Sequence, residues 1–537
     1  MNVMKCVLAY FKKHKLMLVF TLVIIIGITI ISLLPPRLLG MIVDDVIKQD
    51  RYEVLWIYAS IYTILYVLIG ILSFIKDFVL VKISQGITKN VRFTMLKHLN
   101  SISYQELSQL ASGNIEAYFN NDVDAINDLI TSGAVSIVID FLKVIGIAVS
   151  IFLYSLYFGL IVLGVIPLLI LFTSFVRKRM FKTQFTARKL KGSVNSQILE
   201  NVENMEAIKI YKASNYASKK YHESLLQHYN ASMKSSIYDA LFSPVMQITQ
   251  NIIIVVIVIL VAKDNAIFGM SVGMVVSAIS YMKDLFSPIE NIGMEIQTIQ
   301  KSMAGIKRIN QFFKYDTEEE KLDPDNFDFE HVVIEFDHVT FSYEDGVDII
   351  NDYSIIIRDN DKIVLKGDSG AGKSTIFKLA YGLIKPKSGR VTVNGIDAYL
   401  LSDSMKKKLF SIVYQNYFFS NGTIYEELTL LNNNITKEEC YQTLAMVGLK
   451  RVDDIDKKLR LSDFSSGELA LFNIARAVLR NTKVLFLDEM NAKIDPITAR
   501  MILNVINEIS KDKIVLSINH YGELIKDCRI ENIIKLP

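Results

Sequence analysis

The sequence has little cysteine and little net charge, and each shortage excludes a class of protein. Its three cysteines, Cys6, Cys440 and Cys528, lie far apart and form no C-x-x-C pair. We therefore expect neither a disulfide framework nor a metal cluster. The net charge is only +3 over 537 residues, which gives no basis for nucleic-acid binding. Charged residues make up 21% of the chain, whereas 51% of its residues are hydrophobic.

A cleavable signal peptide is also not expected. The first apolar run, residues 16–36, is too long for the hydrophobic core of a signal peptide. It leads into Pro-Pro-Arg and not into the small residues at which a signal peptidase cuts. Because the run stays uncharged throughout, it instead predicts a first membrane helix.

Long uncharged apolar stretches dominate the first half of the chain. A bilayer core of about 30 Å needs about 20 apolar residues in a helix. One stretch, residues 144–176, is too long for a single crossing, so with the apolar residues before it we interpret it as two helices folded at residues 154–158. The sequence thus predicts six membrane helices, the others lying at residues 16–36, 54–75, 240–262 and 265–282.

The flanking charges indicate the orientation of these helices. Basic residues precede the first helix and follow the second and fourth, whereas the loop after the first helix is acidic. Positive residues remain in the cytosol, so we expect a multi-pass protein of the cell membrane with both termini cytosolic. Asp140 and Lys143 lie three residues apart near the inner end of the third span. At that depth Lys143 can extend to the membrane surface, so we expect this pair to have a structural role and not to contact substrate.

Two long cytosolic connections, residues 76–132 and 177–239, are predicted to be continuous helix, because apolar residues recur at three- and four-residue spacing without proline. The membrane domain is expected to end at residue 312 and to be followed by a charged linker, residues 313–330. From residue 331 to 537, β-branched strands alternate with amphipathic helices, which predicts a soluble α/β domain.

A phosphate-binding loop stands early in this second domain. Residues 367–374 have the pattern G-x-x-x-x-G-K-S, between a predicted strand and a helix that opens at Thr375. Glycines let backbone N–H groups wrap phosphates, Lys373 is expected to reach the β- and γ-phosphates of ATP, and Ser374 is expected to bind Mg²⁺. The predicted nucleotide contacts here are Gly367, Asp368, Ser369, Gly370, Ala371, Gly372, Lys373, Ser374 and Thr375.

A second motif, which is acidic, supplies the other groups needed for ATP hydrolysis. An apolar strand beginning at Val484 ends in Asp488 and Glu489. Asp488 is expected to hold the Mg²⁺ ion, and Glu489 to polarise the attacking water. Two carboxylates at the tip of an apolar strand are costly without a cation nearby, which argues against a purely structural role.

Between these motifs the sequence FSSGE at residues 464–468 precedes a helix containing IARA at residues 474–477. This pair resembles the signature segment of ATP-binding cassette (ABC) transporters. The resemblance implies that Tyr343 stacks on adenine, that Gln415 touches Mg²⁺, that Asp495 forms the D-loop and that His520 faces the γ-phosphate. It also implies that a second cassette is contacted in trans by Ser465, Ser466, Gly467 and Glu468.

The resemblance extends through the membrane half. Motifs at residues 113–126 and 200–208 are similar to the intracellular loops of exporter-type half-transporters, with coupling helices implied near residues 104–110 and 211–217. It implies a six-helix type I exporter domain fused to an α/β P-loop cassette that works as a dimer. Because the predicted spans are rich in isoleucine, valine, leucine and methionine and have few charges, we expect an amphipathic or hydrophobic substrate such as a lipid, drug-like compound or peptide. Abundant isoleucine, asparagine and lysine with few prolines are typical of an AT-rich bacterial genome.

The chain departs from the family pattern in its signature, which has FSSGE where LSGGQ is usual, and residues 451–463 show no glycine-bearing X-loop. The C-terminal tail after His520 is also expected to be reduced. These departures leave a homodimer and one subunit of a heterodimer both open. An ATP-gated regulatory or immunity membrane protein and an importer built on the same scaffold remain alternatives to the exporter.

Overall fold

The computed structural model describes residues 2–110, 112–263, 270–343, 347–368, 370–414, 418–432, 434–449, 451–488, 496–518 and 527–533. Its contacts divide the chain into two compact units. The helical unit comprises Met1–Asn100 and Leu110–Tyr315, and the α/β unit comprises Ser101–Gln109 and Asp316–Pro537. The short segment Ser101–Gln109 therefore belongs by its contacts to the α/β unit, although it lies within the predicted membrane half.

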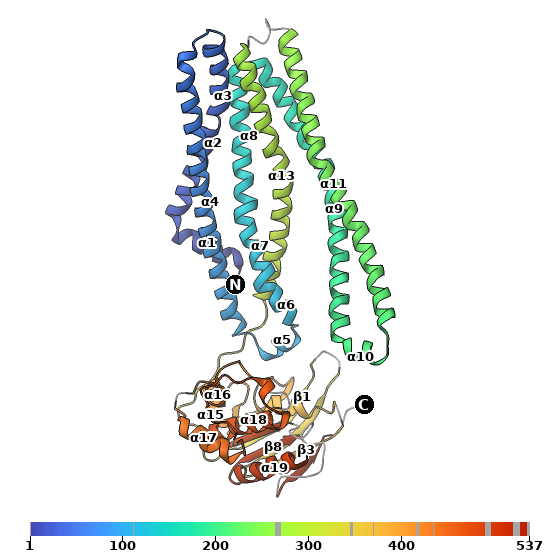
Figure 1. Cartoon of the computed structure of the whole chain (residues 1–537). Coiled ribbons are helices and arrows are strands. Elements are labelled where there is room, and N and C mark those ends of the chain that lie inside the picture. The colour runs from blue at the N-terminus through green and yellow to red at the C-terminus, as the bar shows by residue number, and fades with distance from the viewer. Residues whose placement is uncertain are drawn as a thin grey trace. The chain divides into compact units, whose positions relative to one another are not determined.

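The helical unit consists mainly of long α-helices joined by short turns (Figure 1). In chain order the helices are α1 (Val3–Lys13), α2 (Lys15–Ser32), α3 (Leu34–Met41), α4 (Leu55–Leu99), α6 (Ser112–Ala117), α7 (Val123–Asp128), α8 (Val135–Tyr154), α9 (Leu156–Glu203), α10 (Met205–Ile210), α11 (Ser214–Lys263) and α13 (Val272–Phe312). Short helical segments of other pitch lie between them at Ile42–Ile47, Tyr52–Val54, Tyr118–Asp122 and Leu129–Ala134.

Five helical stretches in the described residues are long and apolar enough to cross a membrane. They are Lys15–Ile47, Tyr52–Leu99, Gly113–Leu153, Leu156–Glu203 and Ser214–Val256. The predicted sixth span, residues 265–282, lies partly outside the described residues, and its described part forms the start of α13. The predicted fold between residues 154 and 158 is confirmed, since Ser155 is extended and separates α8 from α9.

The long helices continue far beyond the length that a membrane requires. α9 has 48 residues, which correspond to about 72 Å at 1.5 Å per residue. The first predicted cytosolic helix is not continuous, because α4 ends at Leu99 and the chain turns before α5 (Tyr104–Gln109). The second connection reverses at α10, slightly earlier in the chain than predicted.

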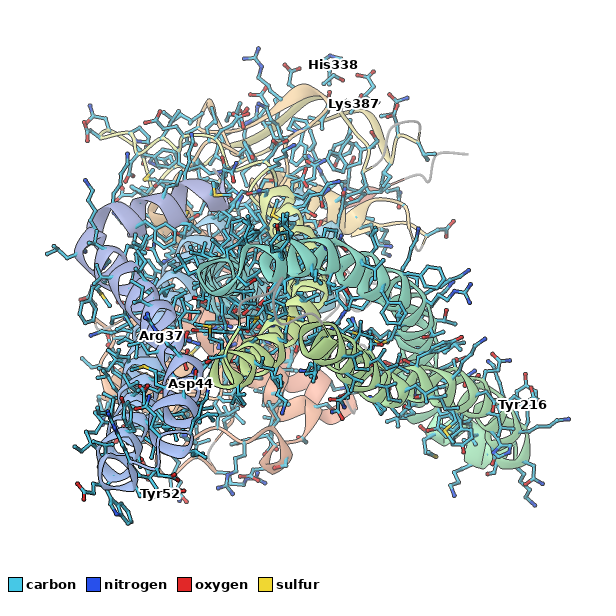
Figure 2. The ribbon with its side chains drawn as sticks, turned by 90° about the horizontal axis from the view of Figure 1, so that it is seen from above. Arg37, Asp44, Tyr52, Tyr216, His338 and Lys387 are labelled. Carbon is cyan, nitrogen blue, oxygen red and sulfur yellow. The ribbon has the colours of Figure 1, made fainter. Side chains whose placement is uncertain are left out.

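The N-terminal end of α13 is fixed by an acidic side chain. Asp44, labelled in Figure 2, accepts hydrogen bonds from the Ser271 hydroxyl and from the Gly273 amide nitrogen, the latter at 3.0 Å. A carboxylate is favoured there, because the first N–H groups of a helix lack partners within the helix. The sequence placed Asp44 in an acidic loop, whereas the structure places it in a helical segment that holds α3 and α13 together.

Asp140 and Lys143 both lie on α8, as predicted. No ion pair between them is found in the described part of the chain, and Oδ2 of Asp140 is buried without a hydrogen-bond partner. The expectation that this pair has a structural role stays a prediction.

The α/β unit contains two sheets. The four-stranded antiparallel sheet has the order β2-β1-β4-β5, and the five-stranded parallel sheet has the order β6-β7-β8-β3-β9. The strands are β1 (Ile334–Phe341), β2 (Ile350–Ile357), β3 (Lys362–Lys366), β4 (Ser388–Val393), β5 (Ile396–Asp397), β6 (Phe410–Val413), β7 (Val484–Asp488), β8 (Ile514–Ile518) and β9 (Arg529–Asn532). Its helices are α5, α14 (Lys373–Ala380), α15 (Asp403–Leu409), α16 (Ile424–Thr429), α17 (Lys437–Met446), α18 (Ser466–Arg480) and α19 (Pro496–Ile509), with a short turn at Leu461–Asp463.

The parallel sheet explains why distant motifs lie near one another. Strands β6, β7, β8 and β3 are neighbours and run in the same direction, so their carboxyl ends share one edge. Ligands of open α/β sheets bind at this edge. The loop after β3 carries the phosphate-binding motif, and the strand β7 ends in Asp488.

The close packing of α3 on α13 can be tested with a small substitution. A Cβ atom on Gly40 would lie 2.6 Å from the carbonyl oxygen of Gly273, so Gly40→Ala must separate the helices. We expect a cost of about 1–3 kcal/mol, measured as a lower midpoint of thermal unfolding in detergent. Gly27→Ala on α2 is the matched control, since its Cβ would meet nothing within 4 Å. Equal midpoints for the two variants would contradict this packing.

Candidate functional site

The loop between β3 and α14 is shaped to receive an anion. Gly370 and Gly372 have φ values of +85° and +91°, a conformation that residues with a Cβ rarely adopt. Lys373 is only 6% exposed, and its Nζ donates hydrogen bonds to the carbonyl oxygens of Gly367 at 2.6 Å and Asp368 at 3.1 Å. The ammonium is thus held at the loop by neutral carbonyl groups, where it can attract phosphate oxygens.

Two oxygen ligands suited to Mg²⁺ stand at the same edge of the sheet. Ser374 is exposed in the first turn of α14, directly after the loop, and Asp488 is the last residue of β7. Hydroxyl and carboxylate oxygens are the donors that Mg²⁺ prefers, so the chemistry of the residues fits the ion. The other predicted site residues Ser369, Gln415, Glu489, Asp495 and His520 lie outside the described residues.

Tyr343, the predicted adenine contact, is brought to the helix that follows the loop. Its hydroxyl lies 3.4 Å from Oγ1 of Thr375 and accepts a hydrogen bond from Nζ of Lys378 at 3.2 Å. Burial is the largest influence on Lys378 and opposes its charge, but the interactions with Tyr343 and Tyr104 together outweigh burial and raise the pKa of this lysine. The structure thus places Tyr343 against α14, the helix that follows the phosphate-binding loop, and its contact with adenine stays a prediction.

The same lysine also reaches α5. Nζ of Lys378 lies 5.6 Å from the centre of the Tyr104 ring, and Tyr104 packs on the core of the α/β unit. Backbone hydrogen bonds from Ser103 to Asp316 and from Glu318 to Ser101 fix the segment before α5. Through one lysine, α5 is therefore connected to Tyr343 and to the helix of the phosphate-binding loop.

The altered signature has a structural role of its own. Ser465 caps α18, its hydroxyl accepting from the Glu468 amide at 3.2 Å, while the Glu468 carboxylate accepts from the Ser465 amide at 2.8 Å. This reciprocal capping box satisfies two N–H groups at the start of the helix. Arg451 lies 3.8 Å from the other carboxylate oxygen of Glu468. Glu468, which stands where the family usually has glutamine, therefore caps the helix on which it lies, and its carboxylate lies near the guanidinium of Arg451.

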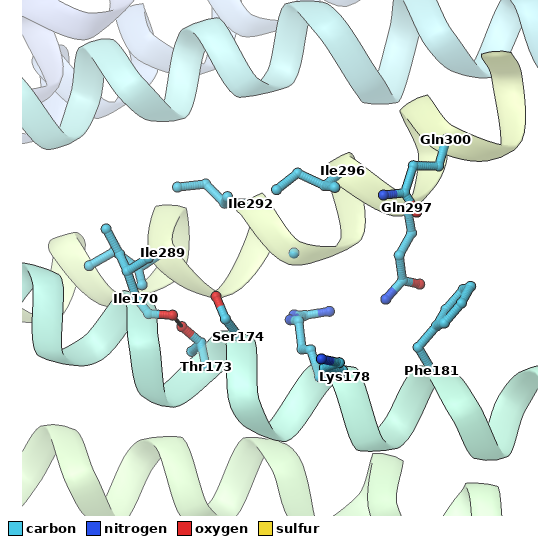
Figure 3. A pocket seen from close by; sticks show the side chains of 12 residues that line it. Ile170, Thr173, Ser174, Lys178, Phe181, Ile289, Ile292, Ile296, Gln297 and Gln300 are labelled. Atoms are coloured by element: carbon cyan, nitrogen blue, oxygen red, sulfur yellow. Dashed lines mark hydrogen bonds between the residues drawn. The ribbon is translucent and has the colours of Figure 1, made fainter.

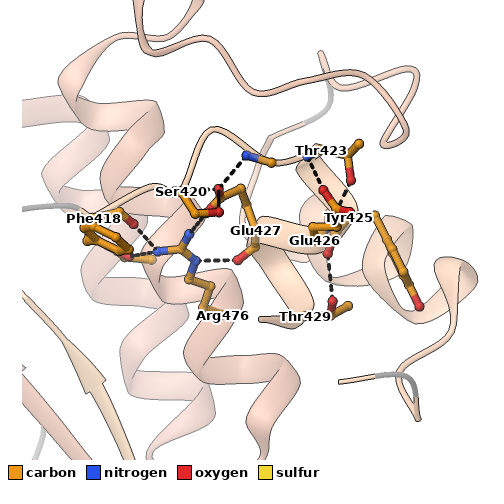
Figure 4. A network of polar contacts seen from close by, with 10 residues as sticks. Phe418, Ser420, Thr423, Tyr425, Glu426, Glu427, Thr429 and Arg476 are labelled. Atoms are coloured by element: carbon orange, nitrogen blue, oxygen red, sulfur yellow. Dashed lines mark hydrogen bonds and ion pairs between the residues drawn. The ribbon is translucent and has the colours of Figure 1, made fainter. Parts of the chain in front are cut away.

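A buried ion pair, which the sequence analysis missed, connects α18 to the chain after residue 417 (Figure 4). Arg476 pairs with Glu427 at 2.5 Å, and Glu427 is only 2% exposed. Arg476 also donates to the carbonyl oxygens of Glu427 at 2.6 Å and Phe418 at 2.8 Å. The carboxylate of Glu427 accepts from the amide and hydroxyl of Ser420 at 2.7 and 2.6 Å.

This network joins segments on either side of the signature. It holds residues 418–422, which follow the predicted Gln415, against the helix that follows Ser465. Two adjacent acids, Glu426 and Glu427, begin α16, and the T-x-x-E pattern at Thr423 predicts a capping box for the first of them. Only the tertiary structure shows that the second is the buried partner of Arg476.

Removing one partner of this pair should be costly. Glu427→Gln keeps the size of the side chain but leaves the Arg476 charge buried and uncompensated, and we expect a loss of about 3–5 kcal/mol. The measurement is the thermal unfolding midpoint of the purified full chain. Lys437→Met, which breaks the exposed Lys437–Asp456 pair, is the matched control and should leave the midpoint unchanged. A Glu427→Gln midpoint equal to that of the control would refute the role assigned to the network.

Comparison with known proteins gives a consistent assignment for both units. The family of the ABC transporter transmembrane region matches residues 18–289, and the ABC transporter family matches residues 350–492. The chain is 25% identical to the putative ABC transporter ATP-binding protein exp8 of Streptococcus pneumoniae, over 98% of this chain and 91% of that protein.

Two relatives from Lactococcus lactis are similar over most of the chain. The lactococcin-A transport/processing ATP-binding protein LcnC is 25% identical, over 92% of this chain and 70% of the relative. A multidrug resistance ABC transporter ATP-binding and permease protein is 24% identical, over 95% of this chain and 87% of the relative. With an apolar helical unit that precedes an α/β cassette carrying the phosphate-binding loop, the chain belongs to the ABC transporter family, as a membrane ATPase of the bacterial exporter group whose ATP hydrolysis is coupled to transport.

Proposed function

We propose that this chain exports an amphipathic or hydrophobic substrate, such as a lipid, a drug-like compound or a peptide, as a dimer of half-transporters. The observation that carries the proposal is the juxtaposition of Lys373, Ser374 and Asp488 at one edge of a parallel sheet, in a chain with membrane-length apolar helices. The names of the relatives include both a bacteriocin transporter and a multidrug transporter. These two names are the basis for including a peptide and a drug-like compound among the substrates proposed for this chain.

The proposed reaction is Mg²⁺-dependent ATP hydrolysis with shared sites. Ser374, Asp488 and Gln415 would hold the ion, which neutralises charge on the phosphates when it is bound. Glu489 would orient and deprotonate the attacking water, and His520 would face the γ-phosphate. Ser465 and Gly467 would close the ATP site of the partner cassette. Asp495, in the D-loop, would lie between the two cassettes. Both chain ends would lie in the cytosol, because the basic residues flank the membrane helices on that side.

The capping box supports a working signature. Glu468 accepts a hydrogen bond from the Ser465 amide and lies 3.8 Å from Arg451, so its negative charge is partly offset within its own chain. A homodimer then has two complete ATP sites. This arrangement favours self-sufficiency of the chain over dependence on a second, different subunit.

The first test is Mg²⁺-ATPase activity of the purified chain alone in lipid nanodiscs. We expect steady turnover in the wild type and a loss of at least about 100-fold in Glu489→Gln, because the group that positions the water is removed. Chelation of Mg²⁺ should abolish turnover in the wild type. If the folded wild-type protein binds ATP but does not hydrolyse it, the homodimer is ruled out. A partner subunit with a different signature is then required.

A second test concerns Tyr343. Replacing an aromatic ring that stacks on a base costs about 1–3 kcal/mol, so Tyr343→Ala should weaken binding of a fluorescent ATP analogue by about 5- to 150-fold. Tyr343→Phe retains the ring, and should bind within about threefold of the wild type. Loss of affinity in the Phe variant equal to that in the Ala variant would show that the hydroxyl contacts to Thr375 and Lys378 matter and not the stacking.

A further inference from the structure

A cavity of about 280 Å³ lies between α9 and α13 (Figure 3). Its walls combine basic and amide side chains with apolar ones. Arg177 and Lys178 from α9 face Gln297 and Gln300 from α13, and isoleucines such as Ile170 and Ile292 line the remainder. Among the described residues that line the cavity, two are cations and none is an acid. The site is therefore built for a ligand that is both apolar and negatively charged.

Arg177 is the unusual member of this cavity. Its side chain is only 5% exposed, yet Nε and one terminal nitrogen, Nη1, are buried with no hydrogen-bond partner in the described residues. The other terminal nitrogen donates to the carbonyl oxygen of Glu290, and the ring of Phe242 lies 4.6 Å from the guanidinium. A buried guanidinium that lacks partners for two nitrogens is costly. These two groups are free to bind an oxyanion, for which the planar fork of arginine is suited.

No carboxylate of the described chain neutralises Arg177 by direct contact. Glu290 touches it through its backbone carbonyl, and no ion pair within 4.0 Å is found between the side chains. Asp239 accepts a hydrogen bond from Gln184 at 3.2 Å. The positive charge is therefore offset only at longer range, and an anion in the cavity would gain a strong partner.

Gly293 shows that the packing of α13 leaves room for this arginine. A Cβ atom on Gly293 would overlap Cδ of Arg177 and lie 2.7 Å from Nε. Any larger residue at position 293 would push the guanidinium away from α13. The glycine thus allows a charged side chain to lie between two helices, against the tendency of such groups to point toward water.

The cavity extends along both helices, with its two cations toward one end and apolar side chains along its length. Arg177 lies 21 residues after Leu156, the first residue of α9, or about 32 Å along the helix. That distance matches the thickness of a hydrocarbon core of about 30 Å. Because α9 and α13 both run toward the same end of the helical unit (Figure 1), Ile170 and Ile289 lie nearer the membrane interior, and Lys178 and Gln300 lie nearer the opposite end. An amphiphile with its head at Arg177 would place its tail along the isoleucines.

We propose that this cavity binds an anionic amphiphile, whose carboxylate or phosphate group lies against Arg177 and Lys178 and whose apolar part lies along the isoleucines of α9 and α13. The inference rests on the proposed transport function, for which it names the substrate class as negatively charged. It assigns Arg177 as the residue that anchors the head group. Lys178 adds a second, more exposed cation at the same end.

The test uses a dansyl-labelled undecanoic acid and its uncharged methyl ester. Both are titrated onto nucleotide-free protein in nanodiscs of phosphatidylcholine. We expect the acid to bind about tenfold or more tightly than the ester, since only the acid can form a charge-assisted hydrogen bond with the guanidinium. Displacement of the labelled acid by dodecyl phosphate but not by laurate would identify a phosphate head group, and the reverse would identify a carboxylate. Dodecyltrimethylammonium carries a positive charge and should not displace the labelled acid.

Four variants locate the site. Arg177→Met should lower the affinity for the acid by about tenfold or more, and Arg177→Lys should recover part of it because the charge returns. Lys178→Met changes an exposed residue and should fold normally, with an affinity about threefold lower. Arg188→Met, at an exposed position on α9 outside the cavity, is the matched control and should bind the acid as the wild type does.

The outcomes separate this inference from the proposed function. Equal binding of the acid and the ester, or unchanged acid binding in both Arg177→Met and Lys178→Met, would overturn the anionic site. ATP turnover is measured on the same wild-type preparation. Hydrolysis without charge-dependent binding would refute the site alone, whereas charge-dependent binding without hydrolysis would refute the proposed homodimer and leave the site standing.

Discussion

A peptide group in the hydrocarbon layer of a membrane has no water to bond, so each crossing segment must satisfy its backbone hydrogen bonds within itself. This chain meets the requirement with α-helices that continue well past the membrane: α4 has 45 residues, α9 has 48 and α11 has 50. Each of these helices is a single continuous element, although Pro167 in α9 and Pro244 in α11 each remove one backbone hydrogen bond. The same constraint therefore accounts for the helical form of the segments within the membrane.

Arg476 and Arg177, both largely shielded from solvent, have opposite surroundings. Arg476 has an acid, two carbonyl groups and the ring of Phe419 around it, which is the condition under which a buried charge is tolerated. Arg177 has one carbonyl group and one aromatic ring, and two of its nitrogens have no hydrogen-bond partner within the described part of the chain. The first arrangement is complete and holds a domain together, whereas the second is incomplete and lines a cavity. This contrast distinguishes a structural charge from one that can bind a ligand.

The signature segment shows how tertiary contacts change the reading of a sequence. From the sequence, Glu468 in place of glutamine raised doubt about the contact with ATP in trans. In the structure its carboxylate caps the Ser465 amide and lies near Arg451. A carboxylate at the start of a helix is favoured by the unpaired N–H groups there. Glu468 thus stabilises the start of the helix that carries Ser465. Its negative charge alone is not a reason to expect a weaker contact with ATP.

Local pattern was sufficient for much of the molecule. The sequence predicts the phosphate-binding loop, the strand β7 and the turn at Ser155 in place, because each depends on short-range chemistry: glycines that permit unusual backbone angles, an apolar run that must be buried, and a break between two apolar helices. The membrane helices followed from their composition. Such local patterns do not predict which polar side chains from distant parts of the sequence contact one another.

The sequence by itself determined that this is a membrane protein with one ATP-binding cassette, since apolar length and the loop motif are properties of contiguous residues. Only the tertiary structure decided which polar residues meet: Asp44 with the start of α13, Tyr104 with Lys378, and Glu427 with Arg476. It also decided that Arg177 faces a cavity, because Gly293 lies opposite it on α13. The physical reason is that the energy of a buried charge depends on neighbours from other helices, and the identity of those neighbours is set by packing and not by the residues beside it in the chain.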